Sequence, residues 1–447
     1  MTTGRPARLI FSVALPLMLG NVFQQLYTVV DTAVVGNVLG VSALAALGAS
    51  DWFNWMFMSI VQGFAQGFSI PLAQAFGAED VPSLRKNVAS AAVLAAVLSL
   101  LISLIALCSI TPVLRLLHTP EEILPLSRLY LTIIFAGTPI VAAYNLLAGI
   151  LRSLGDGNTP LYAMIVASLV NVALDLLFVA IFSWGVAGAA AATLIAQVCS
   201  CSFCLWRLRS VKVVHVSRAD FRLERPRLMH LLRLGTPLAI QNAIISIGGM
   251  IVQSVVNGMG VLFIAGYTAT NKLYGILEIA ATSFGYATTT YTGQNLGAGR
   301  IDRIRSGLRA SLAMCLLASA AIGLCMLIFG RSILSLFISG TPEEVEQSLR
   351  YAYEFLSIMS VALPVLYVLY VYRSTLQGLG DTLMPMVSGF AEFIMRTGAA
   401  MLLPSVVGYR GLFWAEVLAW AGAVIILLIS YYTRFDKLCT RAMIQQP

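Results

Sequence analysis

The chain has 447 residues, of which 59% are hydrophobic and 11% are charged, and its mean hydropathy is +0.86. Soluble globular domains carry about 25% charged residues, so this composition excludes a soluble enzyme, a nucleic-acid-binding protein and a disordered scaffold. The formal net charge of +8 indicates an orientation in the membrane rather than a nucleic-acid partner. We therefore expect an integral membrane protein that crosses the bilayer many times.

Apolar runs long enough to cross a bilayer, which takes about 20 residues, occur twelve times along the chain. The first run is too long for a signal peptide and is interrupted by Pro16 and Asp31, so we interpret it as a span. The runs predict an all-α integral membrane protein with 12 transmembrane helices. They cover residues 12–35, 46–75, 87–110, 124–151, 160–182, 186–206, 234–258, 262–291, 309–330, 352–373, 384–404 and 411–432.

Basic residues are distributed unevenly over the loops between these spans. An even number of spans places both termini on one side, and the loops and tails of that side hold 21 Lys and Arg residues, eight of them in 207–233. This count places Arg373 in such a loop. The opposite loops hold 5. Because Lys-rich and Arg-rich loops stay in the cytoplasm, we expect both termini and the 207–233 linker to be cytoplasmic.

The two halves of the chain resemble one another. Residues 151–160 (LRSLGDGNTP) return as 376–385 (LQGLGDTLMP), and 74–78 (QAFGA) returns as 294–298 (QNLGA), at offsets of 225 and 220. Six spans in each half imply parallel repeats related by a pseudo-two-fold axis along the membrane normal. We expect a six-helix lobe, a basic cytoplasmic linker and a second six-helix lobe, over residues 1–206, 207–233 and 234–447.

Glycines in and between these spans allow two interpretations each. The repeated Leu-Gly-Asp is a helix stop with glycine after the last turn, or a moving cytoplasmic gate. Gly63 and Gly67 permit close helix packing, and their neighbours Gln62 and Gln66 could instead line a pore.

Two acidic residues of the N-terminal half lie inside spans 1 and 5, with no basic residue at the same depth in spans 1, 5 and 6. Asp31 in span 1 and Asp175 in span 5 lie roughly 8–10 Å below the outer interface, with Asn171 one turn before Asp175 and Thr193 of span 6 at that level. Two carboxylates in a low dielectric cannot both stay ionised unaided, which favours a proton or a small cation among hard oxygen ligands. The alternative is that Asp175 hydrogen-bonds between helices and Asp31 faces an aqueous vestibule.

In the C-terminal half, span 8 carries Lys272 and Glu278, and span 11 carries Glu392 and Arg396. Glu392 and Arg396 are four residues apart and can pair on one helix face. The four charges sum to zero, so the cluster needs no bound ion. We interpret it as structural, with a substrate-facing role as the alternative.

These features resemble the multidrug and toxic compound extrusion (MATE) family of secondary transporters over nearly the whole chain. The resemblance depends on the duplicated plan, Pro16 followed by Asp31 in VVDTAVVG, the QAFGA segment after span 2, and Asn171-Val-Ala-Leu-Asp175. It implies two six-helix lobes around a central cavity and export of organic cations or other amphipathic drugs in exchange for H⁺ or Na⁺. Acidic residues on spans 7 and 10 mark the NorM-like branch; span 7 here has none, so the chain resembles the DinF-like branch more closely.

The resemblance also assigns roles to single residues. Asp31 would be the coupling carboxylate, and Pro16 would let span 1 bend once Asp31 is neutralised. Asn145 fits only if Pro139 bends span 4. The implied cation-coupling set comprises Asp31, Tyr130, Asn145, Asn171, Asp175 and Thr193.

On this basis we expect a multidrug exporter that works by alternating access and is not an enzyme. The expected partners are small-molecule drugs and membrane lipids, with no nucleic acid; the protein would be a monomer in the plasma membrane of a prokaryote. We expect no cofactor other than the coupling ion, and no metal other than Na⁺ at Asp31, Asn171, Asp175 and Thr193. A flippase for lipid-linked oligosaccharides, from the same superfamily, is the alternative. The sequence contains no aspartate-rich or histidine motif of the kind that a membrane-embedded transferase needs. A passive channel does not explain an acidic pair in one lobe only.

Overall fold

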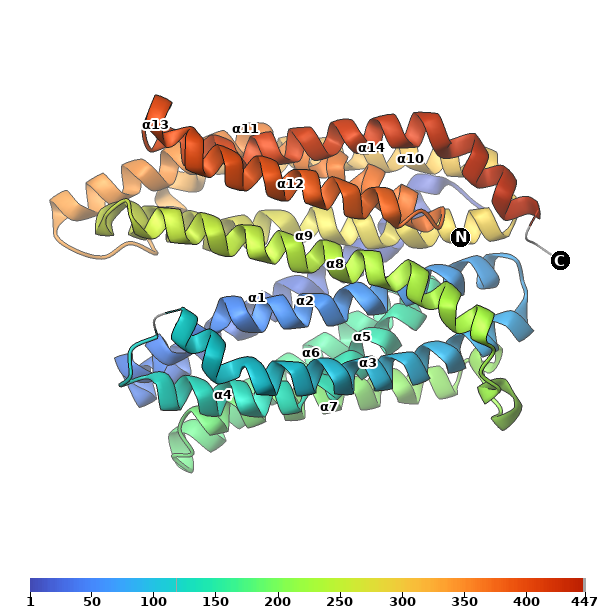
Figure 1. Ribbon diagram of the computed structural model, residues 1–447, viewed down its shortest axis with the longest axis horizontal. Coiled ribbons are helices and arrows are strands. Elements are labelled where there is room, and N and C mark those ends of the chain that lie inside the picture. Colours follow the sequence, from blue (N-terminus) through green and yellow to red (C-terminus); the bar gives the residue numbers. More distant parts are fainter. Residues whose placement is uncertain (118, 445–447) are drawn as a thin grey trace. The chain divides into compact units, whose positions relative to one another are not determined.

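The computed structural model describes residues 1–117 and 119–444, and all regular secondary structure in these ranges is helical (Figure 1). Fourteen α-helices are joined by short connections. Their bounds are α1 Pro6–Leu39, α2 Val41–Gly77, α3 Val81–Leu116, α4 Leu124–Ala136, α5 Thr138–Ser153, α6 Asn158–Asp175, α7 Val186–Arg209, α8 Arg225–Asn257, α9 Val261–Gly297, α10 Ile301–Leu334, α11 Pro342–Gly378, α12 Leu383–Leu402, α13 Pro404–Val407 and α14 Arg410–Ile444. A π-helical turn, η1 (Leu176–Ile181), continues α6, and two 3₁₀ turns, η2 (Lys212–Val214) and η3 (Arg218–Phe221), lie between α7 and α8.

Each predicted span lies, to within about one residue, inside a single helix, α6 with its continuation η1, α12 with α13, or the bent pair α4 and α5. Ten helices are long and apolar enough to cross a membrane on their own, and α4 and α5 together form an eleventh span that bends by 46°. The bend occurs at Gly137, just before Pro139, which has no N–H to donate. The twelfth, α9, has the length but not the hydropathy of a span, because it carries Asn271, Lys272 and Glu278 in its first half and a buried polar run at 288–295 in its second.

Internal contacts divide the chain into two compact units. The N-terminal unit is Leu15–Ala243, and the C-terminal unit joins Met1–Ala14 to the chain from Ile244 onward. Both divisions fall inside helices, in α1 and in α8, so the predicted lobe boundaries at 206 and 234 stay predictions.

In the N-terminal unit, α5 packs against α2, α3 and α7, and α6 packs against α7. Where α2 meets α4, Phe53, Phe57 and Phe135 form an edge-on aromatic cluster with ring centroids about 5.2 Å apart. Such buried aromatic rings contribute most of the apolar area that fixes the mutual position of these helices.

In the C-terminal unit, α11 is the central helix and contacts α9, α10 and α14, while α12 lies along α14 (Figure 1). Tyr267 of α9 stacks on Phe355 of α11 at 4.9 Å, and Phe355 stacks on Phe413 of α14 at 4.8 Å. The stack joins three helices through one apolar seam.

The repeated Leu-Gly-Asp forms a helix stop in both halves, as predicted. Gly155 and Gly380 have φ of +85° and +84°. The backbone N–H of Asp156 donates to the carbonyl of Leu151, and that of Asp381 donates to the carbonyl of Leu376, each at 3.0 Å. This is the left-handed C-terminal cap that glycine makes without steric cost.

The prediction of close packing at two glycines of α2 is also confirmed. A Cβ atom added at Gly63 would lie 2.7 Å from the backbone of Ala239, and one at Gly67 would lie 2.4 Å from Cα of Gly235. Glycine therefore lets the backbones of α2 and α8 touch within the N-terminal unit.

Candidate functional site

The carboxyl groups of Asp31 on α1 and Asp175 on α6 lie within hydrogen-bonding reach of one another. We call these two residues the acidic pair. Asp175 is fully buried. Among the described residues no hydrogen-bond donor reaches Oδ1 of Asp31 or either carboxyl oxygen of Asp175. Two acceptors that face each other without a donor require a proton or a cation between them.

Asn171 adds an amide to the acidic pair. It lies one turn before Asp175 on α6 and is fully buried, and neither its Oδ1 nor its Nδ2 has a hydrogen-bond partner among the described residues. Directly after Asp175 the helix widens into the π-helical turn η1, a deviation that is frequent at functional sites. The end of α6 thus gathers five buried polar atoms of three side chains that the fold itself does not satisfy.

Two tyrosines border the acidic pair. Tyr130 of α4, which the sequence predicted, and Tyr27 of α1, which it did not, both interact electrostatically with Asp31 and Asp175. Tyr27 precedes Asp31 by four residues and therefore lies on the same helix face. That spacing was the available signal for Tyr27.

The remaining predicted residues are placed less closely. The Thr193 hydroxyl donates to the Ala189 carbonyl at 3.1 Å, which leaves its oxygen free to accept. Asn145 lies on α5 beyond the bend and donates to the Val141 carbonyl at 2.9 Å. Pro16 lies inside α1, which is one helix from end to end. The bend that Asn145 requires is present, but among the described residues no hydrogen bond joins Asn145 to the acidic pair.

In the C-terminal unit, four charged side chains form a linear series that we call the ion-pair chain. Glu416 accepts from Arg396 at 2.9 Å, Arg396 also contacts Glu392 at 3.0 Å, and Glu392 contacts Arg373 at 2.8 Å. The predicted pairing of Glu392 with Arg396 is confirmed. Arg373 is not in a loop, as the count of basic residues assumed, but is buried near the end of α11.

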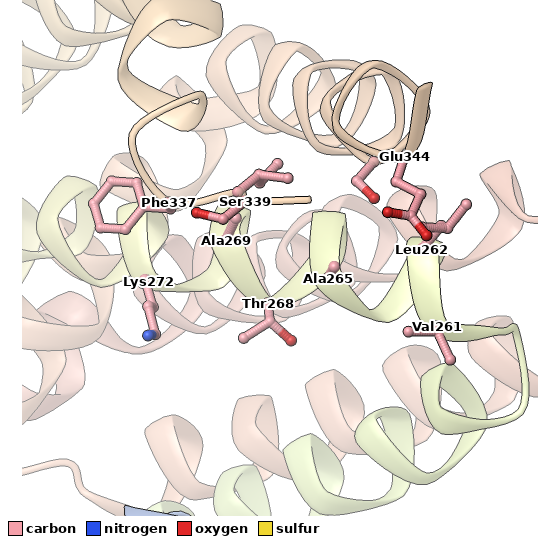
Figure 2. A pocket seen from close by; sticks show the side chains of 11 residues that line it. Val261, Leu262, Ala265, Thr268, Ala269, Lys272, Phe337, Ser339 and Glu344 are labelled. Atoms are coloured by element: carbon pink, nitrogen blue, oxygen red, sulfur yellow. The ribbon is translucent and has the colours of Figure 1, made fainter. Parts of the chain in front are cut away.

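Lys272 takes no part in this series, which corrects the predicted cluster of four. The described residues contain no ion pair to Lys272, which instead lines a pocket of about 420 Å³ between α9 and the connection from α10 to α11 (Figure 2). Phe337, Ser339 and Glu344 line the same pocket. Because Arg373 replaces Lys272 and Glu416 is added, the buried charges of this region no longer sum to zero.

Sequence reasoning missed Arg373 and Glu416 for the same reason. Both lie near the ends of apolar runs, where a charge normally reaches the interface. Only the packing of α11 and α14 against α12 places them inside the unit.

A family model described as MatE matches residues 16–177 and again residues 237–401. The chain belongs to the MatE family. The repeated match falls on the two halves that the sequence repeats had indicated.

Two relatives of this MatE protein are similar along almost their whole length. YpnP of Bacillus subtilis (strain 168), named a probable multidrug resistance protein, is 29% identical over 92% of this chain and 91% of its own. YoeA of the same organism, with the same description, is 28% identical over 94% and 92%. A solved structure of a multidrug resistance MATE family transporter of the MOP superfamily, in an outward-facing conformation, has a TM-score of 0.90 and covers 97% of both chains at 24% identity.

These matches confirm the family resemblance and the all-α membrane fold. As a MatE family member the protein is a transporter and not an enzyme. They do not decide between the DinF-like and NorM-like branches, so the closer resemblance to the DinF-like branch stays a prediction. Both Bacillus relatives are named probable multidrug resistance proteins, which does not favour the flippase alternative.

Proposed function

We propose that this MatE family protein exports amphipathic drugs, organic cations above all, in exchange for H⁺ or Na⁺, by alternating access. The observation that carries the proposal is the acidic pair, two carboxyl groups that meet without a donor and without a basic partner. The names of the two Bacillus relatives support the class of substrate.

The chemistry of the acidic pair suits either coupling ion. A proton shared between Asp31 and Asp175 removes the repulsion between the two carboxylates. A Na⁺ ion would find hard oxygen ligands in the two carboxyl groups, in Oδ1 of Asn171 and in the hydroxyl oxygen of Thr193. Tyr130 and Tyr27 would border this cation-coupling set, and Asn145 would join it only after a rearrangement of α5.

Exchange of drug for ion follows if both are bound by the same negative charge. An organic cation is attracted while Asp31 is ionised, and arrival of H⁺ or Na⁺ cancels that charge and weakens drug binding. Pro16 leaves α1 one backbone hydrogen bond short, so the segment that carries Asp31 can reorient at low cost.

The proposed setting is the plasma membrane of a prokaryote, with both termini and the 207–233 linker in the cytoplasm. The excess of basic residues in loops on that side supports this orientation. The bacterial relatives support a prokaryotic source for the protein. We propose a monomer with lobes 1–206 and 234–447, in contact with membrane lipids, that needs no cofactor besides the coupling ion.

Efflux from proteoliposomes tests the proposal. Ethidium is loaded, and a pH gradient or a Na⁺ gradient is imposed separately. We expect one of the two gradients to accelerate efflux, which also names the ion. Efflux that neither gradient changes would contradict the proposed exchange. No ethidium movement at all, together with transfer of a lipid-linked sugar between leaflets, would favour the flippase alternative.

A further inference from the structure

The linker between α7 and α8 carries most of the net charge of the protein. Residues 207–233 contain eight basic and two acidic residues, a net charge of +6, whereas the whole chain has a net charge of +8. An excess of basic residues orients a membrane protein, but orientation does not require that the charges be held in fixed positions. The structure of the linker separates the charges that the fold uses from those that it leaves at the surface.

The linker is folded onto the end of the N-terminal unit where α7 ends and α8 begins (Figure 1). Its turns η2 and η3 both pack against α3, and Val214 of η2 is buried in an apolar core cluster with residues of α2, α3 and α5. Arg85 of α3 donates to the carbonyls of Lys212 and Val213. The side chains that the linker exposes are therefore presented by a folded segment.

Both acidic residues of the linker are engaged within the fold. The Asp220 carboxylate accepts hydrogen bonds from the backbone N–H and from the hydroxyl of Ser217, each at 2.7 Å. Glu224 pairs with Lys86 of α3 at 2.8 Å and with Arg227 at 3.5 Å. Among the described residues, five basic side chains of the linker are exposed and form no ion pair: Arg209, Lys212, Arg218, Arg222 and Arg225.

Exposed apolar side chains lie among these charges. Phe221 and Leu223, the two neighbours of Arg222, are 49% and 45% exposed, and Trp206 at the end of α7 is 69% exposed. Acyl chains account for exposed apolar side chains inside the spans, but Phe221 and Leu223 lie in the middle of the connection between the predicted spans that end at 206 and begin at 234. Apolar residues interleaved with basic ones are typical of segments that lie in the headgroup layer of a membrane.

An anionic lipid surface fits both the charge and the apolar side chains of the linker. A soluble phosphate or a nucleic acid would match the charge but would leave Phe221 and Leu223 in water. Arg209 follows the predicted span end at 206 by roughly 5 Å along the helix, so the linker starts within the headgroup layer. Anionic phospholipids of the cytoplasmic leaflet attract basic segments beside a span, by about fivefold in affinity for each Lys or Arg.

We propose that the linker is a binding surface for anionic phospholipids of the cytoplasmic leaflet. Arg218, Arg222 and Arg225 bind the lipid phosphates, and Phe221 and Leu223 enter the boundary between headgroups and acyl chains. The inference goes beyond the exchange of drug for ion and uses only the proposed cytoplasmic side of the linker.

Amide hydrogen exchange of the full-length protein in nanodiscs tests the inference. One set of nanodiscs contains phosphatidylcholine alone, and the other contains an equimolar mixture of phosphatidylcholine and phosphatidylglycerol. We expect phosphatidylglycerol to slow exchange at residues 217–225 by about fivefold or more, since bound lipid stabilises the folded linker. High salt should remove the difference, because it screens charges at a surface.

A matched pair of triple variants separates a binding surface from an effect of net charge. Arg218→Gln, Arg222→Gln and Arg225→Gln together should abolish the effect of phosphatidylglycerol on exchange. The control variant changes the exposed residues Arg115, Arg128 and Arg350, which the sequence places on the opposite side of the membrane, to glutamine. It removes the same charge and should keep the effect. Loss of the effect in both variants would contradict the inference.

Three further results would overturn the inference. The first is equal exchange of the wild-type linker in both kinds of nanodisc. The second is slowing by inorganic phosphate or a short RNA, in phosphatidylcholine nanodiscs, as large as that by phosphatidylglycerol, which would indicate a soluble partner. The third is slowing by phosphatidylglycerol that high salt leaves unchanged, and this measurement on the wild type provides the test if the linker variant does not fold. Efflux plays no part in these measurements, so a failure of the proposed exchange would not affect them.

Discussion

Glu79 and Gly299 occupy equivalent positions in the repeated turn after α2 and after α9, and both have a left-handed backbone, with φ of +58° and +68°. The preceding turn is closed alike in both halves, by Ala78 N–H to Gln74 O at 2.9 Å and by Ala298 N–H to Gln294 O at 3.0 Å. The left-handed conformation favours glycine. The C-terminal half has glycine at this position, whereas the N-terminal half has glutamate.

Glu79→Gly should therefore stabilise the protein. The left-handed conformation costs a residue with a Cβ about 1–2 kcal/mol, and the greater chain entropy of glycine offsets about 0.5–1 kcal/mol of that. We expect a net gain of about 0.5–1 kcal/mol, measured by reversible unfolding in mixed micelles. Glu79→Ala removes the charge but keeps the Cβ, so it should give no gain; an equal gain for both variants would contradict this explanation.

Gly67→Ala should destabilise the N-terminal unit. The added Cβ would lie 2.4 Å from Cα of Gly235, and backbone cannot move aside as a flexible side chain can. We expect a loss of about 1–3 kcal/mol and less folded protein after purification. Gly48 lies on the same helix with no atom within 4 Å of its added Cβ, so Gly48→Ala is the matched control and should stabilise by about 0.5–1 kcal/mol, the helix preference of alanine over glycine. Equal behaviour of the two variants would disprove the packing argument.

Arg373→Met should destabilise the C-terminal unit more than loss of a surface ion pair would. It leaves Glu392 with one guanidinium partner instead of two in a buried site, and breaking a buried ion pair costs about 3–5 kcal/mol. The double variant Arg373→Met with Glu392→Gln should recover part of this loss. Thermal unfolding of both variants checks the prediction, and no recovery in the double variant would contradict it.

The linker between α7 and α8 is anchored on α3 by two contacts of different strength. Arg85 donates to the carbonyls of Val213 and Lys212 at 3.2 and 3.0 Å, whereas Lys86 pairs with Glu224 on the surface at 2.8 Å. We expect Arg85→Ala to accelerate amide hydrogen exchange at residues 211–214 by about tenfold, the effect of losing charge-assisted hydrogen bonds. Lys86→Ala should change it little, and a larger effect of Lys86→Ala would reverse this ranking.

The Lys86 contact should also depend on pH. The hydrogen bond from Lys86 holds the pKa of Glu224 below its ordinary value. Its contribution is therefore complete above the ordinary carboxyl pKa and is lost as the pH falls through the lowered value. Titration of Glu224 followed by NMR should give a pKa below that of an exposed glutamate. Lys86→Ala should raise it towards that value, while Arg227, which pairs with Glu224 at 3.5 Å, keeps part of the lowering.

Much of the fold could be predicted because membrane insertion imposes one strong requirement, a long apolar run for each span. Glu278 and Lys272 did not prevent the identification of 262–291 as a span, although α9 is the least apolar of the twelve. The bend at Gly137 was predictable through Pro139. Its counterpart Pro364, at the offset of 225, stays inside the unbroken helix α11, where Ala362 occupies the position equivalent to Gly137.

The candidate site was predictable only where its residues share a helix or a depth. Asp31, Asn171 and Asp175 followed from depth and four-residue spacing. Packing between helices, in contrast, leaves no periodic signal, so Arg373 and Glu416 were missed and Lys272 was placed in the wrong group. The balance of buried charge in the C-terminal unit could therefore be counted only from the structure.

The central claim is that the acidic pair is where ion and drug exchange, and drug affinity at different ion concentrations tests it most directly. Ethidium binding to the purified protein is measured at acidic and alkaline pH, with and without Na⁺, for the wild type, Asp31→Asn, Asp175→Asn and the exposed control Asp302→Asn. We predict that H⁺ or Na⁺ weakens binding to the wild type and to Asp302→Asn, and that this dependence is lost in Asp31→Asn and reduced in Asp175→Asn. A dependence that persists unchanged in both acidic-pair variants, each correctly folded, would contradict the account.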